Sequence, residues 1–192
     1  LVSPSRYDSP NTADLYPYDP ARAAALLDAA GWTDSDGDGI RDKDGVDLSV
    51  VYQTSVNPVR QQIQRIVKRS LTALGVEVEL RYVDASRFFG GEPDNTSNFH
   101  HFYADMQQYT IGNRLPDPLV YLSWMTCDQI PSAENHWSGA NDARWCDPAY
   151  DRLAERAAFE LSPEKRRHLF IRMNDLLVEV NIDDFDALFY HG

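Results

Sequence analysis

Residues 47–84 read DLSVVYQTSVNPVRQQIQRIVKRSLTALGVEVELRYVD, and this stretch decides the fold. Its first part, residues 47–54, is rich in β-branched and aromatic side chains, which favours a strand. Asn57 then suits a helix N-cap, and Gly75 suits the end of that helix. Residues 76–84 alternate apolar and charged side chains, as strands do. Strand, helix and strand in this order predict a βαβ unit whose two strands are parallel.

Apolar side chains mark one face of each predicted helix. The helix that starts at Pro58 is expected to bury Val59, Ile63, Ile66, Val67, Leu71 and Leu74. An earlier helix over residues 20–30 carries Ala23, Leu26, Leu27 and Ala30 on one face. A helix from Pro163 directs Leu169, Met173, Leu176 and Val180 inward. We also expect a strand within 102–110, a short helix over 118–126, a helix from Pro148 and a last strand over 186–190.

These elements predict one domain with a short leading segment. Residues 1–18 are expected to form an extended connector, because the first twenty residues contain four prolines and no helical periodicity. Residues 19–192 carry all the predicted helices and strands, and a chain of 192 residues suits one domain. The fold class is therefore α/β, with a mostly parallel sheet flanked by helices.

The composition and the absent motifs exclude several functions. The chain has 30 acidic and 18 basic side chains, which gives a net charge of −12 at pH 7. Such a surface repels phosphate backbones and anionic membranes, so we expect no nucleic-acid partner. No apolar run approaches the roughly 18 residues of a membrane-spanning helix. GxSxG, HExxH, GxGxxG and phosphate-binding loops are missing from the sequence, so we predict that the protein is not an enzyme.

Two cysteines, Cys127 and Cys146, allow two interpretations. They are two buried free thiols, or they form a disulfide that closes a loop rich in proline, asparagine, serine and glycine. Metal ligation is not expected, because neither cysteine has a partner at CxxC spacing. Trp124, Trp137 and Trp145 cluster around this loop. Exposed, they would suit recognition of a partly apolar solute; the alternative is that they pack on the domain.

Residues 34–45, DSDGDGIRDKDG, begin like a calcium-binding loop. Asp34, Asp36 and Asp38 occupy the first three ligand positions, and Asp42 occupies the ninth. The twelfth position lacks the bidentate carboxylate, and a strand rather than a helix follows. We therefore interpret the stretch mainly as a polar turn or small hairpin, with a weak structural calcium ion as the alternative and no other cofactor. The acidic loop also motivates a second function, a stand-alone extracellular calcium-binding or adhesion module.

Several motifs follow one another in an order that resembles a known family. They are YDPARAAALLDAAGW at 18–32, LTALGVEVELRYVD at 71–84, PDP at 116–118 and CDPAYDRLAERAAFELSPEKRRHLFIRMNDLLVEV at 146–180. Each motif alone is weak, but their joint order over about 170 residues is specific. The order resembles the family 5 extracellular solute-binding proteins of ABC importers, the oligopeptide-, dipeptide- and nickel-binding group.

The resemblance implies a location and a function. The chain would form much of the C-terminal lobe of a bilobed, type II periplasmic-binding-protein-like fold. The whole protein would act as a monomer outside the cytoplasmic membrane, membrane-anchored or secreted, and capture a peptide or similar solute for an ABC permease. Such a compartment is oxidising, which favours the disulfide between Cys127 and Cys146.

The resemblance also implies which residues face the ligand. In peptide-binding members, an aspartate in W-x-(G/A)-D-x-x-D-P pairs with the ligand's α-amine, and the stretch here is YTIGNRLPDP, residues 109–118. Asn113 or Arg114 stands at the aspartate position and neither pairs with an ammonium group, so an anionic or neutral solute is favoured if Arg114 faces the cleft. The candidate ligand-binding residues are Tyr109, Thr110, Ile111, Gly112, Asn113, Arg114, Asp117, Trp124 and Trp137.

Overall fold

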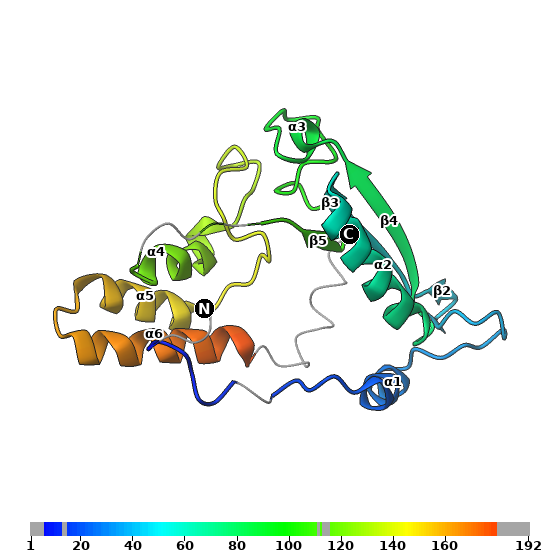
Figure 1. Ribbon diagram of the computed structural model, residues 1–192, viewed down its shortest axis with the longest axis horizontal. Helices are drawn as coiled ribbons and strands as arrows, with labels where there is room; N and C mark the ends of the chain where they lie inside the picture. The colour runs from blue at the N-terminus through cyan, green and yellow to red at the C-terminus, as the bar shows by residue number, and fades with distance from the viewer. Residues whose placement is uncertain (1–5, 13–14, 111, 113–115, 180–192) are drawn as a thin grey trace. The chain divides into compact units, whose positions relative to one another are not determined.

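The computed structural model describes residues 6–12, 15–110, 112 and 116–179. The chain divides into two compact units (Figure 1). One unit is Tyr18–Gly112, and the other combines Leu1–Pro17 with Asn113–Gly192. The sequence predicts a single lobe over residues 19–192, and that boundary stays a prediction. The strand predicted over residues 186–190 lies outside the described residues.

The unit formed by residues 18–112 is built on the predicted βαβ unit. Strand β3 (Ser49–Ser55) leads into helix α2 (Pro58–Thr72), which returns to strand β4 (Glu77–Val83). β3 pairs in parallel with β4, with Val50 opposite Val78, and also in parallel with β5 (Met106–Gln108). The strand order is β4-β3-β5, and α2 lies along β3 and β4 (Figure 1). The parallel arrangement and the third strand agree with the sequence.

The core of this unit lies between α2 and the sheet. Only part of the apolar face predicted for α2 contributes to it. Val50, Tyr52, Val76 and Val78 are buried there, and the α2 side chains that pack on them are Val67, Leu71 and Leu74. Val59 and Ile66 are 64% and 55% exposed, and Ile63 is also exposed. Successive helical residues turn by about 100°, so the face centred on buried Gln64 directs Val59 and Ile66 away from the sheet. The prediction that Val59, Ile63 and Ile66 are buried was therefore wrong.

Helix α1 and a small hairpin precede the sheet. α1 (Pro20–Ala29) begins after Asp19, whose side chain accepts a hydrogen bond from the Arg22 N–H, but it buries none of its residues. Its predicted apolar face is only partly covered within the described residues, because Ala23 and Leu27 are half-buried and Leu26 is exposed. Strands β1 (Asp42–Lys43) and β2 (Val46–Asp47) pair antiparallel across the tight Asp44-Gly45 turn, where both residues have positive φ. The end of the aspartate-rich stretch, together with Val46 and Asp47, therefore forms a small hairpin, and residues 34–41 form the loop that precedes it.

Arg41 ties the hairpin to the helices on either side. Its guanidinium donates to the Asp28 carboxylate at 2.5 Å, to the Trp32 carbonyl at 2.6 Å and to the Leu74 carbonyl at 2.6 Å. The side chain of Arg41 is 15% exposed, so burial strengthens these charge-assisted contacts. One arginine thus fixes the end of α1 against the end of α2.

The second unit is helical. It contains α4 (Leu119–Leu122), α5 (Pro148–Phe159) and α6 (Pro163–Val178), with 3₁₀ turns at Ser123–Met125 and Cys127–Gln129. Asp147 and Ser162 cap α5 and α6 by accepting hydrogen bonds from backbone N–H groups, and a proline opens each helix, as the sequence predicts. Leu169 and Met173 face inward, whereas Val180 lies outside the described residues.

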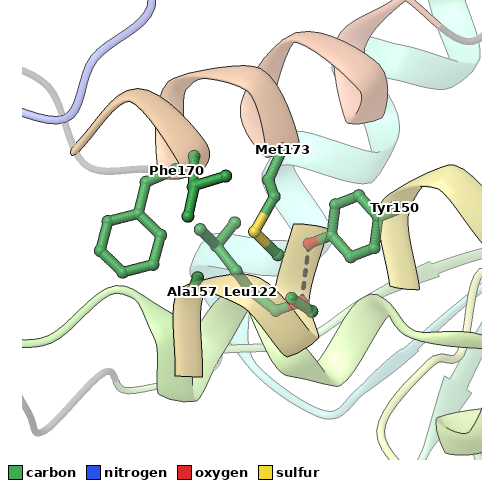
Figure 2. Close-up of a cluster of buried hydrophobic side chains, with 7 residues drawn as sticks. Leu122, Tyr150, Ala157, Phe170 and Met173 are labelled. Carbon is green, nitrogen blue, oxygen red and sulfur yellow. Dashed lines mark hydrogen bonds between the residues drawn. The ribbon is translucent and has the colours of Figure 1, made fainter. Parts of the chain in front are cut away.

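A buried cluster holds these helices together. Figure 2 shows Phe170 and Met173 of α6 pointing toward Leu122 of α4 and Ala157 of α5. The hydroxyl of Tyr150 donates to the Leu122 carbonyl at 2.6 Å within the cluster. Burial, together with the nearby Tyr121 and Asp151, raises the pKa of Tyr150, so its hydroxyl remains a proton donor.

Part of the predicted connector packs on α6. The Tyr7 ring lies edge-on to Phe170 with centroids 5.4 Å apart. The hydroxyl of buried Ser9 donates to the carboxylate of Asp175, which also accepts from the Asn11 amide at 3.1 Å. None of the described helices is long and apolar enough to span a membrane.

Candidate functional site

The candidate ligand-facing segment begins where β5 ends. Tyr109 and Thr110 follow Gln108, the last residue of β5, which is paired with Thr54 near the end of β3. Ligands of open parallel sheets bind beyond the carboxyl ends of the strands. Side chains alternate along an extended chain, so Tyr109 and Thr110 are expected to take opposite faces. In the structure Tyr109 contacts aromatic side chains and Thr110 contacts Arg60 of α2. Ile111, Asn113 and Arg114 lie outside the described residues.

Tyr109 belongs to an aromatic cluster on one side of the sheet. Helix α3 (Ala85–Phe88) follows β4 and supplies buried Phe88, and Phe89 and Phe99 complete the cluster. The Tyr109 ring centroid lies 5.0 Å from that of Phe99 and 6.0 Å from that of Phe88. Phe89 is 47% exposed, so the cluster opens at the surface.

Thr110 lies on the α2 side and contacts a residue to which the sequence analysis gives no role. The guanidinium of Arg60 donates to the Thr110 hydroxyl at 3.0 Å and to the Ser55 hydroxyl at 2.6 Å. Arg60 lies one helical turn before Gln64, the buried residue of α2. The sequence carries no local signal for this contact, because only the structure shows that Gln64 faces inward.

Asp117, another candidate, is engaged within its own unit. One carboxylate oxygen accepts from the Leu119 N–H at 3.0 Å, and the other accepts from the Arg166 guanidinium at 2.7 Å. Arg166 also donates to the Ala157 carbonyl at 2.9 Å and stacks 5.0 Å from the Phe170 ring centroid. The carboxylate of Asp117 therefore holds the start of α4 on α5 and α6, and a contact with ligand stays a prediction.

Replacing Asp117 with asparagine should lower the free energy of unfolding at pH 7 by about 0.5–1 kcal/mol. The Arg166 and Asp117 side chains are 26% and 40% exposed, so solvent screens the ion pair that the substitution removes. Burial alone would raise the pKa of Asp117, but the hydrogen bonds from Leu119 and Arg166 and the arginine charge outweigh it and lower that pKa. The stabilisation is thus complete above the unfolded carboxyl pKa of about 3.9 and is lost as pH falls through the lower folded value.

The measurement for Asp117 is urea unfolding of wild type and Asp117→Asn at pH 7 and at pH 3. The difference between the two proteins should shrink at pH 3, because the aspartate is then increasingly protonated and uncharged. A difference of equal size at both pH values would contradict the role of the charge.

The disulfide loop carries the remaining aromatic candidates. Cys127 and Cys146 form a disulfide, the pairing that the family resemblance implies. Trp124 is half-buried against Tyr121, with ring centroids 5.5 Å apart, and Trp137 is half-buried with a φ of 59°. Trp145 instead packs edge-on to buried Tyr150 and belongs to the core. Trp124, which precedes the loop, and Trp137 within it therefore stay candidates for recognition, whereas Trp145 does not.

Asn141 and Gly139 fix the course of this loop. The amide of fully buried Asn141 donates to the carbonyls of Thr126, at 3.1 Å, and Trp145, at 2.8 Å. Gly139 has a φ of 135°, and a Cβ there would lie 2.1 Å from the Gln129 carbonyl oxygen, so the close approach requires glycine. The loop is thus internally braced as well as cross-linked.

The aspartate-rich stretch brings three of its four predicted metal ligands together. Oxygens of Asp34, Asp36 and Asp38 lie within 4.8 Å of one another. Asp42 is turned toward Ser35, whose N–H and hydroxyl both donate to it at 2.8 Å. Asp34 accepts from the N–H groups of Gly37 and Gly39, which shapes the turn without a cation. Calcium binding here stays a prediction.

Comparison with known proteins identifies the same family that the order of the sequence motifs resembles. The profile of bacterial extracellular solute-binding proteins, family 5 middle region, matches residues 1–132. The oligopeptide-binding protein AppA of Bacillus subtilis is 37% identical over 87 residues, which is 44% of this chain and 16% of AppA. Di/tripeptide-binding protein 3 of Pseudomonas aeruginosa is 24% identical over 191 residues, 93% of this chain and 30% of that protein.

A solved structure shares the fold. The oligopeptide-binding protein of Thermus thermophilus, solved with a pentapeptide, superposes with a TM-score of 0.79 at 24% identity, over 93% of this chain and 31% of that one. The type II α/β fold with a parallel sheet flanked by helices is thereby confirmed. The chain spans less than a third of the length of each of these three relatives. Because the profile covers more than half of its residues, the chain belongs to the family 5 bacterial extracellular solute-binding proteins.

Proposed function

We propose that the protein containing this chain captures a peptide or a similar small solute outside the cytoplasmic membrane and delivers it to an ABC permease. The observation that carries this proposal is the family match over residues 1–132. Peptide-binding relatives and the pentapeptide-bound structure of a protein with the same fold support a peptide as the solute. They favour this function over a stand-alone calcium-binding or adhesion module.

Capture by such a protein involves binding without chemical conversion, and we propose that the protein is not an enzyme. Its work is then to hold the solute by polar contacts and apolar surface and to release it unchanged. The carboxyl ends of β3 and β5 supply both kinds of contact. Thr110 and Arg60 offer polar groups on one side of the sheet, and Tyr109 with Phe89 offers aromatic surface on the other.

Mass spectrometry of the solutes released by denaturing the purified full-length protein tests the proposal. We expect the released peptides to be about equimolar with the protein. Their masses should equal those of peptides in the growth medium. The native protein, freed of solute by unfolding and refolding, should rebind those molecules and return them intact. Hydrolysed or otherwise altered products would contradict non-catalytic capture. Absence of released solute, together with no retention from a defined peptide mixture, would contradict peptide binding.

A further inference from the structure

The outer face of α2 carries a row of apolar side chains, which we call the α2 ridge. Val59, Ile63 and Ile66 are exposed there, and the exposed C-cap residue Ala73 continues the row. Because successive helical residues turn by about 100°, these positions share one side of the helix. Buried Gln64 lies on the opposite side, where α2 packs on β3 and β4. The ridge is therefore not part of the core of its own unit.

The ridge has the spacing of a helix–helix contact. Residues 59, 63, 66, 70 and 73 follow one another at intervals of four and three, the pattern by which one helix packs along another. Single apolar side chains are common on protein surfaces, whereas three β-branched ones in such a row form a continuous strip. From Val59 to Ala73 the row extends about 21 Å, at 1.5 Å per residue. A partner helix of about four turns would match this length.

The charges beside the ridge are positive. α2 contains four basic side chains and no acidic one, although the chain has a net charge of −12. Arg65 and Arg69 are exposed on the flank of the ridge, and neither forms an ion pair with any described residue. Two like charges at i and i+4 destabilise a helix. The flank therefore favours a neighbour that supplies carboxylates.

We propose that the α2 ridge docks a helix of a partner protein, whose apolar residues cover the ridge and whose Asp or Glu side chains pair with Arg65 and Arg69. Covering the ridge removes apolar surface from water, and the fork of each arginine matches a carboxylate. The net charge of this chain repels both an anionic membrane and a second copy, which favours a different protein as the occupant. The docking surface is separate from the proposed solute site at the carboxyl ends of the strands.

Photocrosslinking of the full-length protein in its native host tests the docking. Benzoylphenylalanine in place of Ile66 should crosslink to a segment of another protein, which tandem mass spectrometry identifies. The segment should have helical periodicity, with Asp or Glu beside its apolar residues. Combining Arg65→Glu with Arg69→Glu should lower the crosslink yield about tenfold, because carboxylates then face carboxylates. The matched control combines Arg152→Glu with Arg156→Glu, two exposed arginines of α5 at the same spacing, and should keep the yield.

Binding of synthetic helices by the purified full-length protein measures the charge preference. One fluorescent peptide carries leucines at the spacing of the ridge with glutamates beside them, and its counterpart carries lysines in place of the glutamates. Fluorescence anisotropy should show about tenfold tighter binding of the glutamate peptide by the wild type. The Arg65→Glu and Arg69→Glu double variant should prefer the lysine peptide instead. Ile66→Ala should weaken binding of both peptides.

Other occupants of the ridge predict different results. A crosslink to lipid, to a second copy or to another part of the same protein would overturn the inference, and so would the absence of any crosslink. Ile66→Ala should not lower the urea unfolding midpoint, since alanine favours a helix at an exposed site. A lower midpoint would show that the protein's own remaining parts cover the ridge. Equal binding of the two peptides by the wild type would also contradict the inference, while solute capture stands in every case.

Discussion

Replacing Phe170 with alanine is expected to lower the free energy of unfolding by about 3–5 kcal/mol, the range for truncating a buried phenylalanine. The side chain is 1% exposed and lies in the cluster that joins α4, α5 and α6 (Figure 2). Its ring also contacts Tyr7 edge-on and supports the Arg166 guanidinium. Truncation thus leaves a cavity and removes a partner of the arginine that holds Asp117.

Urea unfolding followed by far-ultraviolet circular dichroism measures this effect. The matched control is Phe159→Ala, which makes the same change at the last residue of α5, where the side chain is 84% exposed. That control should change stability by less than about 0.5 kcal/mol. A loss below 1 kcal/mol for Phe170→Ala, or similar losses at both positions, would contradict the assignment of Phe170 to the centre of the helical core.

Removing the disulfide by replacing Cys127 and Cys146 with alanine should cost about 3 kcal/mol. The bond joins cysteines 19 residues apart, and a closed loop of that length restricts the unfolded chain by about this free energy. The N–H of Cys127 also donates to Asp151 of α5 at 3.1 Å, so the cross-link holds the loop beside the helical core. The loop should remain partly ordered without the bond, because Asn141 still links Thr126 and Trp145.

Chemical reduction of the wild type provides a control for the disulfide prediction. Dithiothreitol should lower the unfolding midpoint of the wild type to that of the double variant and leave the variant unchanged. The fluorescence of Trp124 and Trp137 should report the local loosening of the loop at lower denaturant than the helical signal. A wild-type midpoint that does not respond to complete reduction, checked by thiol titration, would contradict a stabilising role.

Local signals made much of the fold predictable from the sequence. Capping residues and helix-starting prolines act within one turn of the chain, so Asn57, Asp147 and Ser162 correctly place the starts of α2, α5 and α6. Strand patterns and the βαβ order give the parallel pairing of β3 with β4. The order of the motifs, read along the whole chain, indicates the family that the profile confirms.

Side-chain partners distant in the sequence were not predictable. Only the tertiary structure brings Arg60 to Thr110, 50 residues later, and Arg166 to Asp117, 49 residues earlier. The tertiary structure also sets which face of α2 packs on the sheet, with Gln64 facing the sheet and Val59 facing away from it. The sequence by itself thus determined the elements, their order and the family, because those depend on short-range capping and periodicity. The tertiary structure decided which charged side chains are paired within the chain, because that pairing depends on packing between segments far apart in the sequence.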